Sequence, residues 1–136
     1  MADELSLGDV VCQLALLMKR NNLPIGFKDE APWHLLFYRL KREAKQGRPG
    51  FLDHLRFDSD ARYPRCRELS EFLHGLHTAC IVDVANPSFE EMILPDDVMS
   101  DWEQERSALD TKSKSFLAQG LEIAKEEFPL KQEVNA

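Results

Sequence analysis

The sequence PRCRELSEFLHGLHTACIVDVANPSFEEMIL occupies residues 64–94 and decides the fold that we predict. Pro64 suits the first position of a helix, where its missing N–H removes no hydrogen bond. Apolar residues then recur at three- and four-residue spacing, which places one apolar stripe on a helix that runs to about Thr78. These residues are Cys66, Leu69, Phe72, Leu73 and Leu76.

The second half of this stretch changes to strand chemistry. Residues 79–84 are rich in β-branched side chains, Asn86-Pro87-Ser88 is typical of a turn, and residues 89–94 form a second apolar run. Helix, strand, turn and strand follow one another in the second half of a winged-helix domain. The sequence therefore predicts a mainly α fold of the α+β class, with a winged-helix-like core and a small β-hairpin.

The residues before this stretch predict two helices and a short strand. The first helix runs from Ser6 to Asn21, and Ser6 with Asp9 resembles a capping box. The second helix runs from Pro32 to about Gln46, and its buried face includes aromatic side chains. Residues 51–58 alternate between apolar and polar, which favours a short strand.

The residues after the hairpin predict a helical extension. Residues 95–97 offer a helix N-cap, and a last helix runs from near Asp110 to Phe128. We expect Trp102 to anchor this part to the domain. The expected organisation is one domain over residues 1–136, with a core at 1–95 and an appended C-terminal helical extension at 96–130.

Composition favours an ordinary globular protein of the cytoplasm. Of the 136 residues, 43% are hydrophobic and 30% are charged. No apolar run approaches the roughly 20 residues of a membrane span, so we expect no membrane contact. The acidic N-terminus lacks the basic region of a secretory signal, and three cysteines in no regular framework favour a reducing compartment.

The charge distribution yields one candidate site. The chain carries a net charge of −7, yet residues 39–67 hold nine basic and four acidic groups, a balance of +5. Such a block could neutralise phosphates of DNA or contact another anionic partner. Acidic residues after Arg67 and a hairpin tip without a cation weaken the DNA interpretation. The six candidate contact residues are Arg39, Arg42, Lys45, Arg62, Arg65 and Arg67.

Nothing in the sequence favours catalysis, a metal or another cofactor. Cys66, His74, His77 and Cys80 form a set of zinc-like ligands. Cys66 and His74 are about 12 Å apart along one helix, however, so four ligands cannot converge there. Any of Cys12, Cys66 and Cys80 would be a conceivable nucleophile if the fold placed it near His34 or His54, but no oxyanion loop or nucleophile elbow accompanies them.

The order of elements over residues 32–95 resembles small bacterial proteins related to the Panacea, or SocA-like, antitoxin family. The resemblance rests on Trp33-His34-Leu35-Leu36-Phe37-Tyr38, on the extended residues 55–58, on Tyr63-Pro64 with the following helix, and on the apolar hairpin. It implies a cytoplasmic prokaryotic protein that works through protein–protein contact, and it carries over no catalytic residue.

The sequence therefore predicts a non-enzymatic bacterial protein-interaction or adapter module, with antitoxin-like activity as one form. A protein partner is expected, and a homodimer through apolar surface on the last helix is one version of it. The alternative is a DNA-binding winged-helix regulator that uses the basic block at 39–67.

Overall fold

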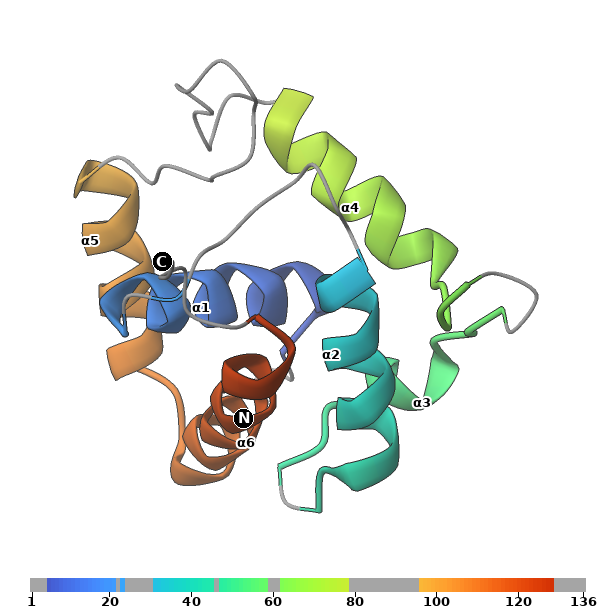
Figure 1. Ribbon diagram of the computed structural model, residues 1–136. Helices are drawn as coiled ribbons and strands as arrows, with labels where there is room; N and C mark the ends of the chain where they lie inside the picture. Colours follow the sequence, from blue (N-terminus) through green and yellow to red (C-terminus); the bar gives the residue numbers. More distant parts are fainter. Residues whose placement is uncertain are drawn as a thin grey trace, which may run out of the picture.

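The computed structural model describes residues 5–21, 23, 31–45, 47–58, 62–78 and 96–128. Within these ranges the chain forms six helices (Figure 1). In chain order they are α1 (Leu7–Arg20), α2 (Ala31–Glu43), α3 (Gly50–His54), α4 (Arg67–Thr78), α5 (Asp96–Ser107) and α6 (Thr111–Glu127).

The predicted start of α1 is confirmed in detail. The Asp9 N–H donates to Ser6 Oγ at 3.1 Å, and the Ser6 N–H donates to an Asp9 carboxylate oxygen at 3.0 Å. Both bonds of a capping box are therefore present, and two backbone donors that the helix leaves unpaired are satisfied. The start of α6 uses the same chemistry, because Asp110 accepts a bond from the Ser113 N–H at 2.8 Å.

Three helices form the centre of the molecule. The last helix, α6, packs against both α1 and α2, while α5 packs against α1 and α3 packs against α2 (Figure 1). Helix α4 joins the same core through the fully buried Leu69 and Leu73. Its Phe72 ring faces Gly8, where a Cβ atom would lie 2.9 Å from the ring.

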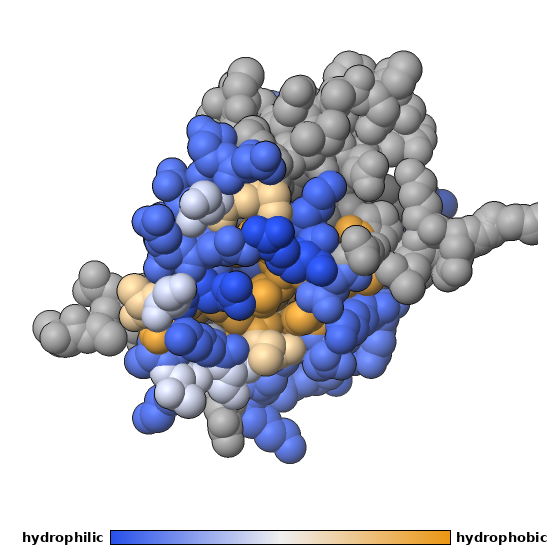
Figure 2. Space-filling model, turned by 90° about the vertical axis from the view of Figure 1, so that its left-hand side faces the viewer, coloured by the Kyte–Doolittle hydropathy of each residue, from blue (hydrophilic) through white to orange (hydrophobic). Residues whose placement is uncertain are grey.

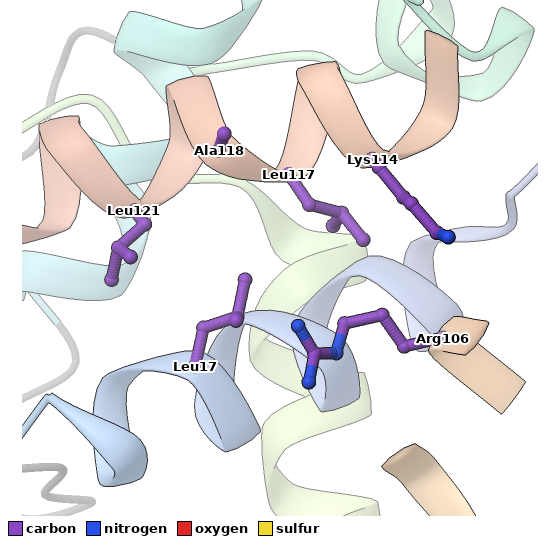
Figure 3. A pocket seen from close by; sticks show the side chains of 6 residues that line it. All are labelled: Leu17, Arg106, Lys114, Leu117, Ala118 and Leu121. Atoms are coloured by element: carbon purple, nitrogen blue, oxygen red, sulfur yellow. The ribbon is translucent and has the colours of Figure 1, made fainter. Parts of the chain in front are cut away.

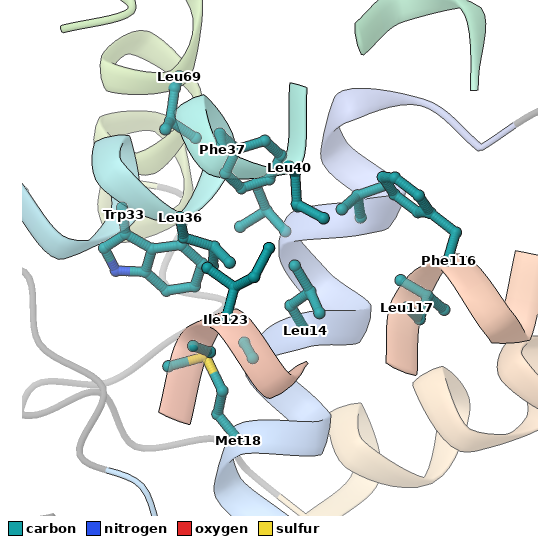
Figure 4. Close-up of a cluster of buried hydrophobic side chains, with 14 of the residues drawn as sticks. Leu14, Met18, Trp33, Leu36, Phe37, Leu40, Leu69, Phe116, Leu117 and Ile123 are labelled. Carbon is teal, nitrogen blue, oxygen red and sulfur yellow. The ribbon is translucent and has the colours of Figure 1, made fainter. Parts of the chain in front are cut away.

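One cluster of buried apolar side chains holds these helices together. Figure 4 shows Leu14 and Met18 of α1 meeting Trp33 and Phe37 of α2 and Phe116 of α6. The apolar periodicity of all three helices predicted these faces. Since burying one such side chain stabilises a protein by about 1.5–3 kcal/mol, this cluster outweighs any surface interaction in the molecule.

The predicted winged-helix core is wrong for the described part of the chain. Those residues contain no strand, and a single antiparallel bridge joins Asp58 to Arg65 through N–O distances of 2.8 and 3.2 Å. The predicted strand at 51–58 is instead α3 followed by an extended link. The β-hairpin predicted at 79–94 lies outside the described residues.

Local chemistry explains why a helix replaces the strand. Pro49 has φ −72° and ψ 152°, and its carbonyl accepts a bond from the Leu52 N–H at 3.2 Å, which closes a helical turn. Leu52 is fully buried in that turn. The alternation that favoured a strand holds only around Leu55 and Phe57, which is too short to define one.

The fold prediction described the last helix as an appended extension, but α6 is part of the core. Phe116, Leu117 and Ala124 of α6 are buried in the same cluster as α1 and α2. The Trp33 ring packs edge-on against Phe128, just after α6, with ring centroids 5.2 Å apart. The core therefore needs residues from both ends of the described chain.

Gly47 sits in the turn between α2 and α3. Its φ of +69° lies in the left-handed region, and a Cβ atom there would overlap the Lys112 carbonyl oxygen. Only glycine satisfies both requirements at low cost. This turn consequently lies tightly against the start of α6.

Two glycine substitutions should shift stability in opposite directions. Gly47→Ala should lower the free energy of unfolding by about 2 kcal/mol or more, since it adds left-handed strain to a clash with backbone. Gly75→Ala should raise it by roughly 0.5–1 kcal/mol, since Gly75 is an exposed position of α4 with nothing within 4 Å of the added methyl. Urea denaturation of both variants measures the two effects, and equal effects would contradict this account of the turn.

Candidate functional site

Arg39, the first residue of the predicted basic block, is engaged inside the protein. Its guanidinium bonds Glu43 of α2 at 2.9 Å and both Glu126 and Glu127 of α6 at 2.7 and 3.0 Å. These bonds raise the pKa of Arg39, and the bond from Arg39 lowers the pKa of Glu43. Arg39 therefore ties α2 to α6 and is not available to phosphates.

Two further cations of the block bond backbone carbonyls at helix ends, Arg48 at the end of α2 and Lys41 just after α3. Arg48 donates to the carbonyl oxygens of Lys41 and Ala44 at 2.8 and 3.0 Å and also pairs with Asp53. Lys41 donates to the Leu55 carbonyl at 2.7 Å. Cations at these positions satisfy carbonyls that a helix end leaves unpaired.

The predicted contact residues fall into separate parts of the structure, since Arg39 and Arg42 belong to α2 whereas Arg65 and Arg67 line a cavity with Asp58. The Arg42 guanidinium of α2 lies 5.4 Å from the Tyr38 ring centroid, and Lys45, two residues after α2, is exposed. Arg65 and Arg67 line one cavity of about 320 Å³ together with Asp58. Arg62 is exposed three residues before Arg65, so the structure groups Arg65 with Arg67 and places Arg39 elsewhere.

Carboxylates reduce the positive charge at this cavity. Asp58 is part of its lining, and Arg67 pairs with Glu71 at 3.2 Å. The Arg67 side chain is 89% exposed, so this ion pair is weak, and the arginine stays mobile in solvent. An anion bound here would displace Glu71 and face Asp58.

The structure places Cys66 beside His34, but the contact is made by the Cys66 backbone and not by its thiol. The pair is therefore not arranged as a nucleophile and a base. The backbone N–H of Cys66 donates to His34 Nδ1 at 2.9 Å. Since Nδ1 accepts, the ring proton of the neutral imidazole is on Nε2, which lies 3.2 Å from Ser70 Oγ. This tautomer has no free nitrogen to take a proton from Ser70.

The two thiols in the described residues are held in the protonated form. Burial is the main cause that raises the pKa of Cys66, whose Sγ lies 3.3 Å from a Glu68 carboxylate oxygen. Burial, with Asp9 and Glu105, raises the pKa of Cys12 to about 12. Since the thiolate is the nucleophile, neither position favours thiol chemistry. Cys80 lies outside the described residues.

A different feature, a groove between α1, α5 and α6, combines apolar and cationic side chains on the surface. Its volume is about 160 Å³. Figure 2 shows this side of the molecule, where apolar side chains are exposed between strongly hydrophilic ones. The lining residues are Leu17, Arg106, Lys114, Leu117, Ala118 and Leu121.

The helix packing builds the apolar floor of the groove. Leu17 lies one helical turn after Leu14 on α1, and Leu117 and Leu121 flank Gly120 on α6. Gly120 and Leu14 meet where the two helices cross, because a Cβ on Gly120 would lie only 2.9 Å from the Leu14 side chain. The floor is thus the place where the contact between α1 and α6 opens toward solvent.

Helix α5 supplies the polar wall. Gln13 of α1 holds α5 through a bond from its side-chain nitrogen to the Trp102 carbonyl at 2.8 Å, and Arg20 pairs with Glu103. The predicted role of Trp102 as an anchor is supported, since its side chain packs against the core. Arg106 follows one turn after Trp102 and so reaches the groove.

The cations of the groove lack carboxylate partners. Arg106 Nε is buried and has no hydrogen-bond partner, and no described carboxylate pairs with Arg106 or Lys114. Lys114 makes only a long contact of 3.5 Å with the Ser107 carbonyl. Figure 3 shows the Arg106 side chain extending toward Leu17, with the Lys114 amine beside Leu117. The groove can therefore accept a group that is apolar at one end and anionic at the other.

Sequence reasoning did not predict this groove. It placed Leu117 and Leu121 on the apolar side of the last helix, and both belong to or pack against the core. Self-association through that helix stays a prediction. Arg106 was missed because it stands alone in an acidic stretch, outside the basic block. The signal that points to it is the helical spacing from Trp102 to Arg106, which places both on the side of α5 that faces α1.

Comparison with known proteins adds no relative. No protein-family model, no curated protein and no solved structure matches the chain. The resemblance to the Panacea family therefore stays a prediction. Among the described helices, none has the length and apolar character that crossing a membrane requires.

The Arg39 cluster predicts a specific dependence of stability on pH. The pKa of Glu43 lies below its ordinary value of 4.5 in the folded protein, so its contribution is present above that pH and is lost as the pH falls through the folded pKa. Arg39→Gln removes the cause of the shift. The measurement is the urea midpoint of wild type and of Arg39→Gln. We expect the difference between the two midpoints to be largest at about pH 7 and to decrease toward about pH 3. A difference that is constant over this range would contradict the role of Arg39.

Proposed function

We propose that this protein is a small helical protein-interaction module that binds another protein and does not catalyse a reaction. The observation that carries the proposal is the groove of α1, α5 and α6, in which an apolar floor reaches the surface together with Arg106 and Lys114, two cations that pair with no carboxylate among the described residues. Polar residues around an apolar centre are typical of binding surfaces. The resemblance to the Panacea family points to the same class and to the bacterial cytoplasm.

The chemistry elsewhere in the described residues supports binding over catalysis. The imidazole of His34 carries its proton toward Ser70, and the thiols of Cys12 and Cys66 have raised pKa values. Catalysis would instead need an imidazole nitrogen without a proton facing the nucleophile, or a thiol whose pKa is lowered.

Photo-crosslinking tests the proposal at residue resolution. A benzophenone amino acid replaces Ala118, an exposed groove residue, in the full chain expressed in its native cells. We expect a discrete protein adduct from this position, either with another protein or with a second copy of the chain. The matched control carries the same amino acid at Arg67, an exposed residue of α4.

The adduct should disappear when Leu17→Glu is added to the Ala118 variant, because a carboxylate on the floor repels an apolar partner. Absence of any adduct at position 118, or identical adducts from positions 118 and 67, would count against a binding role for the groove.

Duplex DNA binding is the second candidate, and the cavity shared by Arg65 and Arg67 favours it. Asp58 in that cavity and Glu71 on Arg67 oppose it, as does the engagement of Arg39 with α6. Three of the nine cations at 39–67, Arg39, Arg48 and Lys41, are bonded within the protein, so less positive charge is left for phosphates than the sequence suggests.

A salt titration separates the two candidates. We expect no binding of a fluorescent DNA duplex at about micromolar protein in moderate salt. If binding appears, weakens steeply with salt and is abolished by Arg65→Ala combined with Arg67→Ala, the DNA candidate replaces the interaction module. Lys125→Ala, a cation of α6 paired with Glu122, serves as the matched control.

A further inference from the structure

We infer that the groove binds an acidic segment of a partner protein, in which one apolar side chain stands next to an aspartate or glutamate. The apolar side chain occupies the floor at Leu17, Leu117 and Leu121, and the carboxylate binds Arg106. This inference rests on the proposed function and assigns the chemistry of its partner.

The state of Arg106 defines the anionic half of the ligand. Its Nε is buried without a hydrogen-bond partner among the described residues, and an unsatisfied buried donor destabilises the free protein. A guanidinium presents Nε and a neighbouring terminal nitrogen in the geometry that matches the two oxygens of a carboxylate. Because Nε is covered in the free protein, a carboxylate that enters the groove pairs with it after a change of the Arg106 side-chain rotamer.

Charge complementarity selects an acidic partner. The chain has a net charge of −7, and residues 68–136 carry 15 acidic against 5 basic groups. Arg106 and Lys114 belong to this acidic half, yet neither pairs with any of its described carboxylates. The groove is therefore a local positive site in a negative region, and it attracts a carboxylate while it repels a lysine or arginine.

The volume of the groove limits the apolar half of the ligand to one side chain. A cavity of about 150 Å³ holds a benzene-sized group, and this groove has about 160 Å³. Drug-sized ligands occupy pockets of roughly 300–1,000 Å³. A leucine, methionine or phenylalanine side chain fills the floor, and the rest of the partner segment lies across the exposed surface at Ala118.

A partner protein fits these features better than a second copy of the chain. Two copies that each carry −7 repel one another, and the two cations of one groove would face the two cations of the other in a symmetric dimer. A short acidic segment meets a smaller repulsion, because it carries fewer negative charges than a whole second copy, and it brings no second pair of groove cations.

Selection from random peptides tests the inference. Twelve-residue peptides displayed on phage are selected on the immobilised full-length protein, and the enriched peptides are synthesised with a fluorescent label. We expect an aspartate or glutamate next to leucine, methionine or phenylalanine in the enriched sequences. Anisotropy titrations then measure their affinity for wild type and for each variant.

Substitutions at Arg106 separate charge from geometry. Arg106→Gln should weaken peptide binding by at least about tenfold, because it removes the charged partner of the carboxylate. Arg106→Lys should weaken it by a smaller factor, because the charge stays while the two-point geometry is lost. Arg67→Gln, on α4, should leave the affinity unchanged.

Ala118→Glu keeps the test informative if an Arg106 variant fails to fold. The substitution places a carboxylate on the exposed surface of a helix and should also weaken binding of the acidic peptides by about tenfold. Circular dichroism and urea denaturation establish that each compared variant is folded.

The outcomes distinguish the inference from the function on which it rests. Two results would contradict the acidic partner: peptides that bind the groove without an acidic residue, and peptides that bind Arg106→Gln as tightly as wild type. Either result would still agree with a protein-interaction module. A dimer in sedimentation that Ala118→Glu dissociates overturns it too, because a second copy then covers the groove. Failure to enrich any peptide, together with no crosslink at position 118, rejects both.

Discussion

The close crossing of α1 and α6 at Leu14 and Gly120 is the contact on which the rest of the structure depends. The absence of a side chain at Gly120 allows α6 to approach α1, and a Cβ atom there would lie 2.9 Å from Leu14. On one side of this crossing the helices close over the buried cluster with α2. On the other side they separate at Leu17 and Leu121, and this separation forms the floor of the groove. The core and the candidate binding surface are therefore two sides of one helix pair.

Part of the positive charge of residues 39–67 is used inside the protein. Arg39 joins α2 to α6, and Arg48 closes the end of α2. Each exposed ion pair contributes about 0–1 kcal/mol, whereas each buried leucine or aromatic side chain contributes about 1.5–3 kcal/mol. The ion pairs thus orient helices that the apolar core has already brought together. A count of charges along the chain does not separate such internal contacts from a surface that binds a partner.

The sequence predicts the helices well because their signals are local. The capping box of Ser6 and Asp9 and the buried stripe of α2 follow from residues within one or two turns. The prediction failed where pairing between distant segments decides the structure. Residues 51–58 have too few alternating positions to define a strand, and the turn after Pro49 is helical because Leu52 is buried there. The winged-helix prediction depended on this strand together with the hairpin.

The candidate groove could not be predicted from the sequence, for a related reason. Leu17, Leu117 and Leu121 carry the same apolar signal as core residues, and only the packing of three helices shows which of them reach the surface. Arg106 has no sequence signal of its own, since its role depends on the carboxylates that the fold keeps away from it.

The position of α6 in the chain has a consequence for the synthesis of the protein. Trp33 packs on Phe128, and Arg39 binds Glu126 and Glu127, so α2 completes its contacts only with the end of α6. At about 5–20 residues per second, ribosomes need roughly 4–17 s to extend the chain from the end of α2 to the end of α6. During this time the nascent chain exposes the apolar faces of α1 and α2. A chaperone that recognises exposed aromatic and aliphatic side chains has these seconds in which to bind before α6 covers them.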